Sequence, residues 1–346
     1  MYSPIFYDTP FCPQQSRYEQ MVFRKAGKSG LSLPALSLGL YHFFGNLDPY
    51  EQMRKTVRTA FENGIFHLDV ADCYGPPNGE AEYHLGRIIR QDFRPYRDEL
   101  VIATKAGFDS FLGPNGEGGS RKHLTASINR SLKNLGLDYV DVFYHHVEDP
   151  ATPLEETAET LASFVRQGKT LYIGISNYSF ENSRKILKLL EEEKCPVVLN
   201  QCRYNLMHRE IERDVIPLME EHGVGIAAYV PLAQGLLSGK YAAGSYDLAT
   251  RKDSIDFEMS GRIPEQVQKQ LKSLNEIAQN RGQTLAQMAM AWCLRMENVT
   301  TILIGCHNEK HIPENIAALK NLSFSEEELR QIDTIVSDTE MCPSEG

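Results

Sequence analysis

The amino-acid sequence predicts a (β/α)8 barrel, in which eight parallel strands form a closed ring and helices surround it. Three observations support this fold class. Eight short apolar runs rich in branched side chains recur along the chain. Helical patterns separate them, and the alternation extends over about 300 residues, enough for this fold. An open doubly wound sheet is the alternative, but no Gly-x-Gly-x-x-Gly sequence follows the first run.

The strands are expected in the order in which these apolar runs occur. Each run has the length of an ordinary strand and is bounded by turn-forming residues. The runs are residues 35–40, 66–71, 100–104, 140–144, 171–175, 197–200, 226–230 and 301–304. Between them, apolar residues recur at helical spacing, which predicts helices over 154–165, 211–218 and 267–278.

Three segments are expected to add to the barrel. Residues 1–20 are expected to form an N-terminal arm that packs against another subunit, and residues 21–340 a single barrel domain. Apolar residues at 21–23 and 31–33 flank a turn-rich stretch, which predicts a small hairpin. Residues 235–262 follow the seventh strand and are too long for an ordinary connection, so a loop over a binding site is expected there.

Composition narrows the class of protein. A hydrophobic fraction of 42% and a charged fraction of 24% are typical of a soluble globular enzyme. The net charge of −10 argues against a nucleic-acid partner. No apolar stretch is long enough to cross a membrane, and the first twenty residues do not resemble a signal peptide. The seven cysteines are widely spaced without a Cys-x-x-Cys, which predicts free thiols in a reducing cytoplasm.

Ionisable residues stand at the ends of three consecutive predicted strands, where a barrel places its active site. Asp69 ends the second strand and Tyr74 lies in the turn after it, while Lys105 ends the third. A tyrosine needs a nearby cation to ionise near neutrality, and a lysine on an apolar strand needs a carboxylate partner. Each residue alone would more often be part of a surface pair or a packing contact. Their shared position favours a catalytic site.

The fourth strand ends in His145 and His146, and strand geometry separates the two. Alternate side chains face opposite ways, so His146 shares a face with Val140 and Val142. Small branched residues dominate barrel interiors, which predicts that this face points inward. His146 is therefore expected at the mouth of the barrel, and His145 against the surrounding helices.

A metal-dependent barrel enzyme is a rival interpretation. Its candidate ligands would be Asp72, His145, His146, Glu148 and Asp149. Lys105 would bring a positive charge to the cation, and neither His-x-His nor His-Glu-x-x-His is present. We therefore expect no metal site.

Combined, the motifs resemble the aldo-keto reductase superfamily from about residue 20 to residue 336. They are Asp69 and Tyr74 in Asp-x-Ala-x-x-Tyr-Gly, Lys105 in Ala-Thr-Lys, His146 in His-x-x-Asp, and the runs 174–177 and 231–235. Within the superfamily, residues 75–80, 118–122 and 232–241 look most similar to bacterial L-glyceraldehyde 3-phosphate reductases. The β subunits of potassium channels are more distantly similar.

The resemblance implies NADPH-dependent reduction of aldehydes or ketones, with L-glyceraldehyde 3-phosphate or methylglyoxal as candidate substrates. Tyr74 would be the general acid, Lys105 would lower its pKa, Asp69 would hold Lys105, and His146 would orient the carbonyl. A nicotinamide-binding regulatory subunit without turnover is the alternative. A homo-oligomer is also implied.

The resemblance further implies which residues hold the cofactor. They are Tyr41, Ser176, Asn177, Gln201, Tyr229, Pro231, Leu232, Gln234, Gly235, Leu237, Lys240, Arg251, Gly305, His307, His311, Glu314 and Asn315. His307 and His311 stand where relatives commonly carry Ser and Gln or Arg, which leaves NAD open. Arg251 and Lys310 favour NADP.

The substrate pocket is expected to be formed by Tyr41, Phe43, Tyr74, Phe108 and the loop 111–121. Arg121 and Lys122 could attract a phosphorylated aldehyde there. They could equally be a surface pair at the start of a helix.

Overall fold

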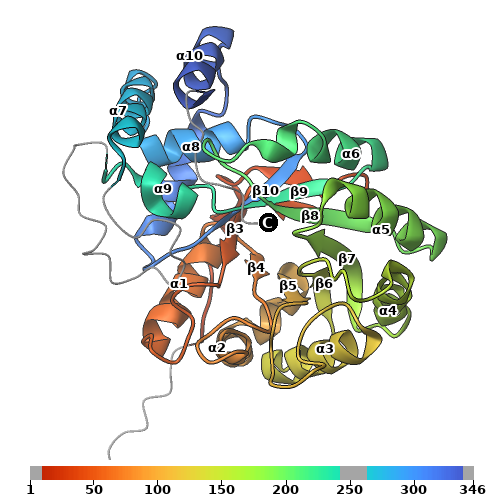
Figure 1. Cartoon of the computed structure of the whole chain (residues 1–346). Helices are drawn as coiled ribbons and strands as arrows, with labels where there is room; N and C mark the ends of the chain where they lie inside the picture. The colour runs from red at the N-terminus through yellow and green to blue at the C-terminus, as the bar shows by residue number, and fades with distance from the viewer. Residues whose placement is uncertain (1–9, 242–262, 338–346) are drawn as a thin grey trace, which may run out of the picture.

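The computed structural model describes residues 10–241 and 263–337. Its centre is a closed barrel of eight parallel strands, which confirms the predicted fold class (Figure 1). The strands are β3 (Leu36–Gly39), β4 (His67–Asp69), β5 (Val101–Ala106), β6 (Val140–His145), β7 (Thr170–Ser176), β8 (Val197–Arg203), β9 (Gly225–Tyr229) and β10 (Val299–Ile304). They pair in chain order, and β10 closes the ring against β3. Every predicted apolar run contains one of these strands or overlaps it.

Helices cover the outside of the ring (Figure 1). They are α1 (Tyr50–Glu62), α2 (Glu80–Ile88), α3 (Arg121–Leu135), α4 (Leu154–Arg166), α5 (Phe180–Glu192), α6 (Val215–His222), α7 (Glu265–Asn280), α8 (Leu285–Cys293), α9 (His311–Ile316) and α10 (Glu326–Ser337). Helices α7 and α10 lie beside each other at one edge of the molecule (Figure 1). No helix in the described ranges is long and apolar enough to cross a membrane.

Local sequence explains where these helices begin and end. Ser120 caps α3 by accepting a hydrogen bond from the backbone of His123, and Gly136 ends it with a φ of +66°. The predicted helices over 154–165 and 267–278 are confirmed as α4 and α7. The prediction over 211–218 was partly wrong, because α6 begins only at Val215. Pro217 has no N–H and is tolerated only in a first helical turn, so a helix from 211 could not continue through it.

The predicted hairpin is present, and it closes the amino-terminal end of the barrel. Its strands are β1 (Phe23–Lys25) and β2 (Ser32–Pro34). Ala26 and Leu33 are fully buried in one cluster with apolar side chains of β5, β6, β8 and β9. This plug fills the bottom of the barrel, so the opposite end is left for a site.

The described part of the N-terminal arm packs on its own barrel. Phe11 lies against Phe93, with ring centroids 5.1 Å apart. Arg17 and Tyr18 both donate to the carboxylate of Glu99. The expectation that residues 1–20 also contact another subunit stays a prediction.

Candidate active site

A cleft of about 1190 Å³ lies at the carboxyl end of the barrel. Its walls come from the ends of strands β3 to β10 and from the turns that follow them. Asp69, Tyr74 and His146 all lie in its lining. A cleft of this size is large enough for a dinucleotide together with a small substrate.

Lys105 joins two of these residues beneath the floor of the cleft. Its side chain is fully buried, and its ammonium group donates to Asp69 Oδ1, which is the carboxylate partner expected from the sequence. The same Nζ lies 3.1 Å from Tyr74 Oη and 2.9 Å from the carbonyl of Val70. Asp69 Oδ2 accepts a second hydrogen bond, 2.9 Å long, from Gln201 Nε2 on β8. The buried charges are therefore paired and hydrogen-bonded, as burial requires.

Burial determines the protonation state of Tyr74. It raises the pKa of the phenol well above its usual value, and the negative charge of Asp69 raises it further. Lys105 lies where its positive charge would favour the phenolate, so the expectation that it lowers the pKa of Tyr74 from the value set by burial stays a prediction. Tyr74 is therefore a phenol near neutral pH and can donate a proton.

His146 faces Tyr74 across the cleft. The ring centroids of Tyr74 and His146 are 5.9 Å apart, and Phe108 packs edge-on against His146 at 4.7 Å. Burial and the nearby charge of Lys105 lower the pKa of His146 well below its usual value. The imidazole is therefore neutral and can donate one hydrogen bond.

His145 points the other way, as the alternation along β6 predicted. Its Nδ1 is hydrogen-bonded to the hydroxyl of Tyr178, and Gly119 lies against its ring. Phe143, on the same face of β6, packs against Phe164 of α4. Burial lowers the pKa of His145 to about 4, which indicates a neutral packing residue.

Polar side chains at the ends of β7 and β9 hold one wall of the cleft in place. Asn177 adopts a positive φ of 53°, uncommon for a residue other than glycine. Its Oδ1 accepts a 2.8 Å hydrogen bond from the hydroxyl of Tyr229, and its Nδ2 donates to the carbonyl of His146 at 2.9 Å. Tyr229 is thus fixed with its ring in the lining, where a planar heterocycle could stack on it.

The turn after β9 has a backbone suited to an anion. Val230, Ala233, Gln234 and Gly235 all have positive φ angles between 46° and 92°. Turns that combine right- and left-handed residues direct backbone N–H groups into concave anion sites. Lys240 lines the cleft beside this turn. The ring of Tyr229, the side-chain amides beside it and the backbone N–H groups of this turn together fit a nicotinamide dinucleotide.

Most of the predicted cofactor residues gather in this one cleft. Those in its lining are Tyr41, Ser176, Asn177, Gln201, Tyr229, Pro231, Leu232, Gln234, Gly235, Lys240, Gly305, His307, His311 and Asn315. Leu237 is instead buried in the core, and Glu314 is exposed on α9. Arg251 lies outside the described residues.

Ten residues that line the cleft were not named as site residues from the sequence. They are Gly39, His42, Cys73, Asn78, Asp109, Val230, Tyr241, Leu303, Ile304 and Asn308. Each lies within four residues of a predicted site residue in the chain. Treating every strand end together with the loop that follows it would have found them.

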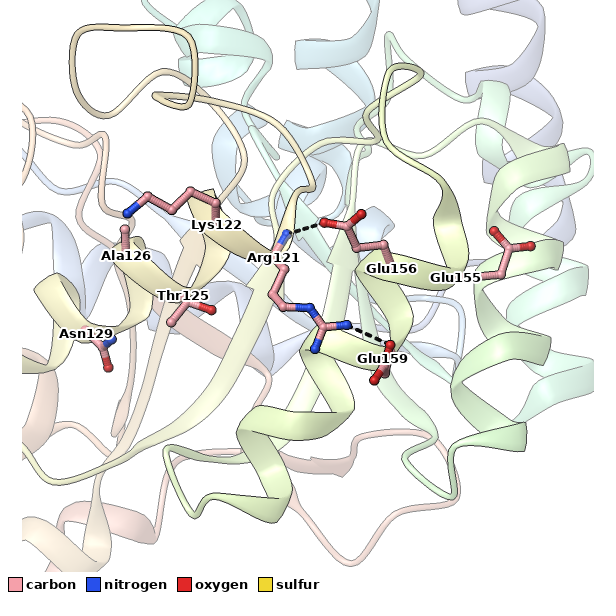
Figure 2. A pocket seen from close by; sticks show the side chains of 8 residues that line it. All are labelled: Arg121, Lys122, Thr125, Ala126, Asn129, Glu155, Glu156 and Glu159. Atoms are coloured by element: carbon pink, nitrogen blue, oxygen red, sulfur yellow. Dashed lines mark hydrogen bonds and ion pairs between the residues drawn. The ribbon is translucent and has the colours of Figure 1, made fainter.

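Arg121 and Lys122 belong to a different place. They line a shallow groove between α3 and α4 on the outer surface (Figure 2). The backbone N–H of Arg121 donates to Glu156 at 2.9 Å, and its guanidinium pairs with Glu159 at 2.7 Å. Phe111 is not in the lining of the cleft either, because its ring packs against the buried His123 of α3, with centroids 5.6 Å apart. The surface-pair interpretation is therefore confirmed, and the placement of Arg121 and Lys122 near the substrate was wrong.

The candidate metal ligands have other partners. Asp72 pairs with Arg130, and Glu148 accepts hydrogen bonds from Ser179 at the start of α5. Asp149 accepts from the backbone of Gly119. Within the described ranges, no three His, Cys, Asp or Glu side chains are grouped so as to hold a metal ion.

Comparisons with known proteins agree with this geometry. A sequence model described as the aldo/keto reductase family matches residues 35–337. The chain is 49% identical over 330 residues to an L-glyceraldehyde 3-phosphate reductase of Escherichia coli O157:H7, covering 94% of this chain and 95% of that protein. It is 34% identical over 304 residues to a "Probable voltage-gated potassium channel subunit beta" of Arabidopsis thaliana, covering 86% and 91%.

Proposed function

The chain belongs to the aldo/keto reductase family of oxidoreductases, and from this premise we propose that it reduces aldehydes and ketones to alcohols with NADPH, using Tyr74 as the proton donor. The observation that carries the proposal is the buried chain from Asp69 through Lys105 to the Tyr74 hydroxyl, which opens into the cleft opposite His146.

The cofactor would lie along the side of the cleft formed by β7, β9 and the turn after β9. Tyr229 would stack on the nicotinamide, and Ser176, Asn177 and Gln201 would bind its amide. The turn 232–235 and Lys240 would hold the phosphates. When bound, the reduced cofactor supplies the hydride that adds to the carbonyl carbon.

The protein residues then have distinct tasks. His146 donates a hydrogen bond to the carbonyl oxygen and orients it. Tyr74 gives its phenolic proton to that oxygen as negative charge develops there. Lys105, held by Asp69, stabilises the phenolate that this transfer leaves behind. The high pKa of Tyr74 before reaction keeps the proton in place until it is needed.

L-glyceraldehyde 3-phosphate and methylglyoxal are our candidate substrates. The name of the Escherichia coli relative supports the first of them. The test is NADPH oxidation by the purified protein with each compound, and with glyceraldehyde lacking the phosphate. We expect turnover with small aldehydes that is abolished in Tyr74→Phe. An inactive protein with intact NADPH binding would instead support the regulatory-subunit alternative, which the potassium-channel relative favours.

A cytoplasmic location and a homo-oligomeric state stay predictions. Sedimentation of the purified full-length chain at several concentrations measures the second directly.

A further inference from the structure

The thiol of Cys73 lies beside the ring of His146. Cys73 directly precedes Tyr74 and lines the cleft as a half-buried residue. Its Sγ is 3.9 Å from His146 Nδ1. This distance is that of a weak hydrogen bond involving sulfur. No role for Cys73 follows from the proton transfer described above.

The contact affects which of the two ring nitrogens of His146 carries the proton when the imidazole is neutral. A neutral imidazole carries one proton, on either Nδ1 or Nε2. Only the Nε2–H form of His146 can donate to a carbonyl in the cleft while Nδ1 faces Cys73. Nε2 has no hydrogen-bond partner among the described residues, and it is not among the enclosed polar atoms, so it is open to the cleft.

The other neighbours of His146 do not select between the two forms. Tyr74 and Phe108 pack against the imidazole as rings, which fixes its plane but not its proton. The backbone carbonyl of His146 is bound by Asn177, a contact that does not reach the ring. Nδ1 therefore has Cys73 as its polar neighbour in the described part of the chain.

We propose that Cys73 is a positioning residue that donates its S–H to His146 Nδ1 and thereby keeps the His146 proton on Nε2, toward the substrate. The proposal rests on the role of His146 in the proposed function. Burial raises the pKa of Cys73 to about 12, so the thiol keeps its proton at neutral pH and remains a donor. Sulfur is a weak acceptor, which disfavours the opposite arrangement with the proton on Nδ1.

The direct test is the tautomer of His146, read from ring nitrogen chemical shifts of protein labelled with ¹⁵N-histidine. The spectrum of His146→Ala identifies the His146 signals. We expect the Nε2–H form in the wild type and a clear share of the Nδ1–H form in Cys73→Ala. A wild type with the proton on Nδ1, or an unchanged tautomer ratio in Cys73→Ala, would overturn the proposal.

Kinetics supply a second readout. Cys73→Ala should lower kcat about three- to tenfold, the effect of losing one weak hydrogen bond, with the Kd for NADPH unchanged. Cys73→Val, which has similar volume but no donor, should behave like Cys73→Ala. Cys73→Ser should recover part of the lost turnover, since a hydroxyl can donate to Nδ1. Equal kcat values in the wild type and in all three Cys73 variants would contradict a positioning role.

The controls separate this proposal from the function on which it rests. Cys12→Ala makes the same change at an exposed cysteine and should alter neither readout. The chemical shifts need no turnover, so they report on Cys73 even if no carbonyl substrate is reduced. If the enzyme reduces carbonyl substrates but the tautomer ratio of His146 is the same in the wild type and in Cys73→Ala, the positioning role of Cys73 is wrong and the proposed function is unaffected.

Discussion

At the scale of single residues, the site depends on pairing charges that would otherwise be costly to bury. Lys105 is fully enclosed, and its ammonium group is partnered by Asp69, the carbonyl of Val70 and the Tyr74 hydroxyl. Removing one member of such a group leaves the others unpaired, which is more damaging than exchanging a surface pair. Tyr74 differs from Lys105 because it lies in the lining of the cleft, and from Asp69 because its hydroxyl carries a proton that it can give to a substrate.

Tyr74→Phe tests this difference. The variant removes the proton donor and leaves the ring, so the Kd for NADPH should stay near that of the wild type. Turnover should fall by about 10² to 10⁴-fold, the usual contribution of a general acid. Steady-state NADPH oxidation measures the loss, and fluorescence quenching measures binding. Wild-type turnover in Tyr74→Phe would mean that another group supplies the proton.

The two adjacent histidines should respond differently to the same substitution. His146→Ala removes a side chain from the cleft, so turnover should fall while NADPH still binds. His145→Ala leaves the buried hydroxyl of Tyr178 without its partner, which should cost about 1 to 3 kcal/mol of unfolding free energy. Steady-state kinetics and urea unfolding of both variants show which histidine acts in catalysis and which in packing. Loss of turnover confined to His145→Ala would show that the roles are reversed.

At the scale of elements, α2 is tied to the barrel by a buried carboxyl. Glu82 is fully buried and accepts hydrogen bonds from Thr104 on β5 at 2.7 Å and from Asn134 on α3 at 3.2 Å. Helix α2 directly follows the loop that carries Tyr74, so this contact anchors the loop from behind. Burial raises the pKa of Glu82 to about 7, and the nearby charge of Asp72 contributes to the rise.

This anchor should make stability depend on pH. The folded-state pKa of Glu82 lies above its unfolded value, so the folded state binds the proton more tightly between about pH 4.5 and pH 7. Its contribution to stability is full below that range and is lost as the pH rises through the folded-state pKa. A tenfold difference in proton affinity between the folded and unfolded states corresponds to about 1.4 kcal/mol. Stability measured by urea unfolding should therefore decline toward pH 8.

Glu82→Gln isolates the effect, because the amide cannot ionise. The stability of the variant relative to the wild type should improve steadily from pH 5 to pH 8. Glu62→Gln, an exposed substitution near the end of α1, is the matched control. A constant difference between Glu82→Gln and wild type over this range would show that Glu82 does not change its protonation there.

At the scale of the whole molecule, the barrel brings distant segments together at one end. The hydrogen bond between Gln201 and Asp69 joins residues 132 positions apart. The hairpin closes the opposite end, and the carboxyl ends of the eight strands, or the loops that follow them, line one cleft. The long segment after β9 begins at this cleft, where Lys240 and Tyr241 form part of the lining.

The preference for NADPH over NADH depends on segments that come from distant parts of the chain. We predict that NADPH binds more tightly than NADH, because Arg251 and Lys310 carry positive charges that would favour the additional phosphate; Arg251 lies outside the described residues. Arg251→Ala should weaken NADPH binding about tenfold or more, the effect of losing one charged hydrogen bond, and leave NADH nearly unchanged. Arg184→Ala, on the exposed face of α5, is the control. Equal or tighter binding of NADH, unaffected by Arg251→Ala, would contradict the prediction.

The sequence by itself determined the order of strands and helices and the facing of the two histidines. Both follow from local periodicity, because side chains alternate along a strand and recur every three to four residues along a helix. The sequence also predicted that Asp69, Tyr74 and Lys105 lie at or just after strand ends, and a barrel brings those ends together in one place. The break before α6 was missed, although Pro217 signalled it.

The tertiary structure alone decided the surroundings of each side chain. It turned Arg121 outward to Glu159, and it placed the Cys73 thiol beside His146. It also raised the pKa of Tyr74 despite the neighbouring Lys105. These outcomes depend on distances between residues far apart in the chain and on how completely water is excluded. Periodicity along a sequence records neither quantity, because both arise only when the helices close around the barrel.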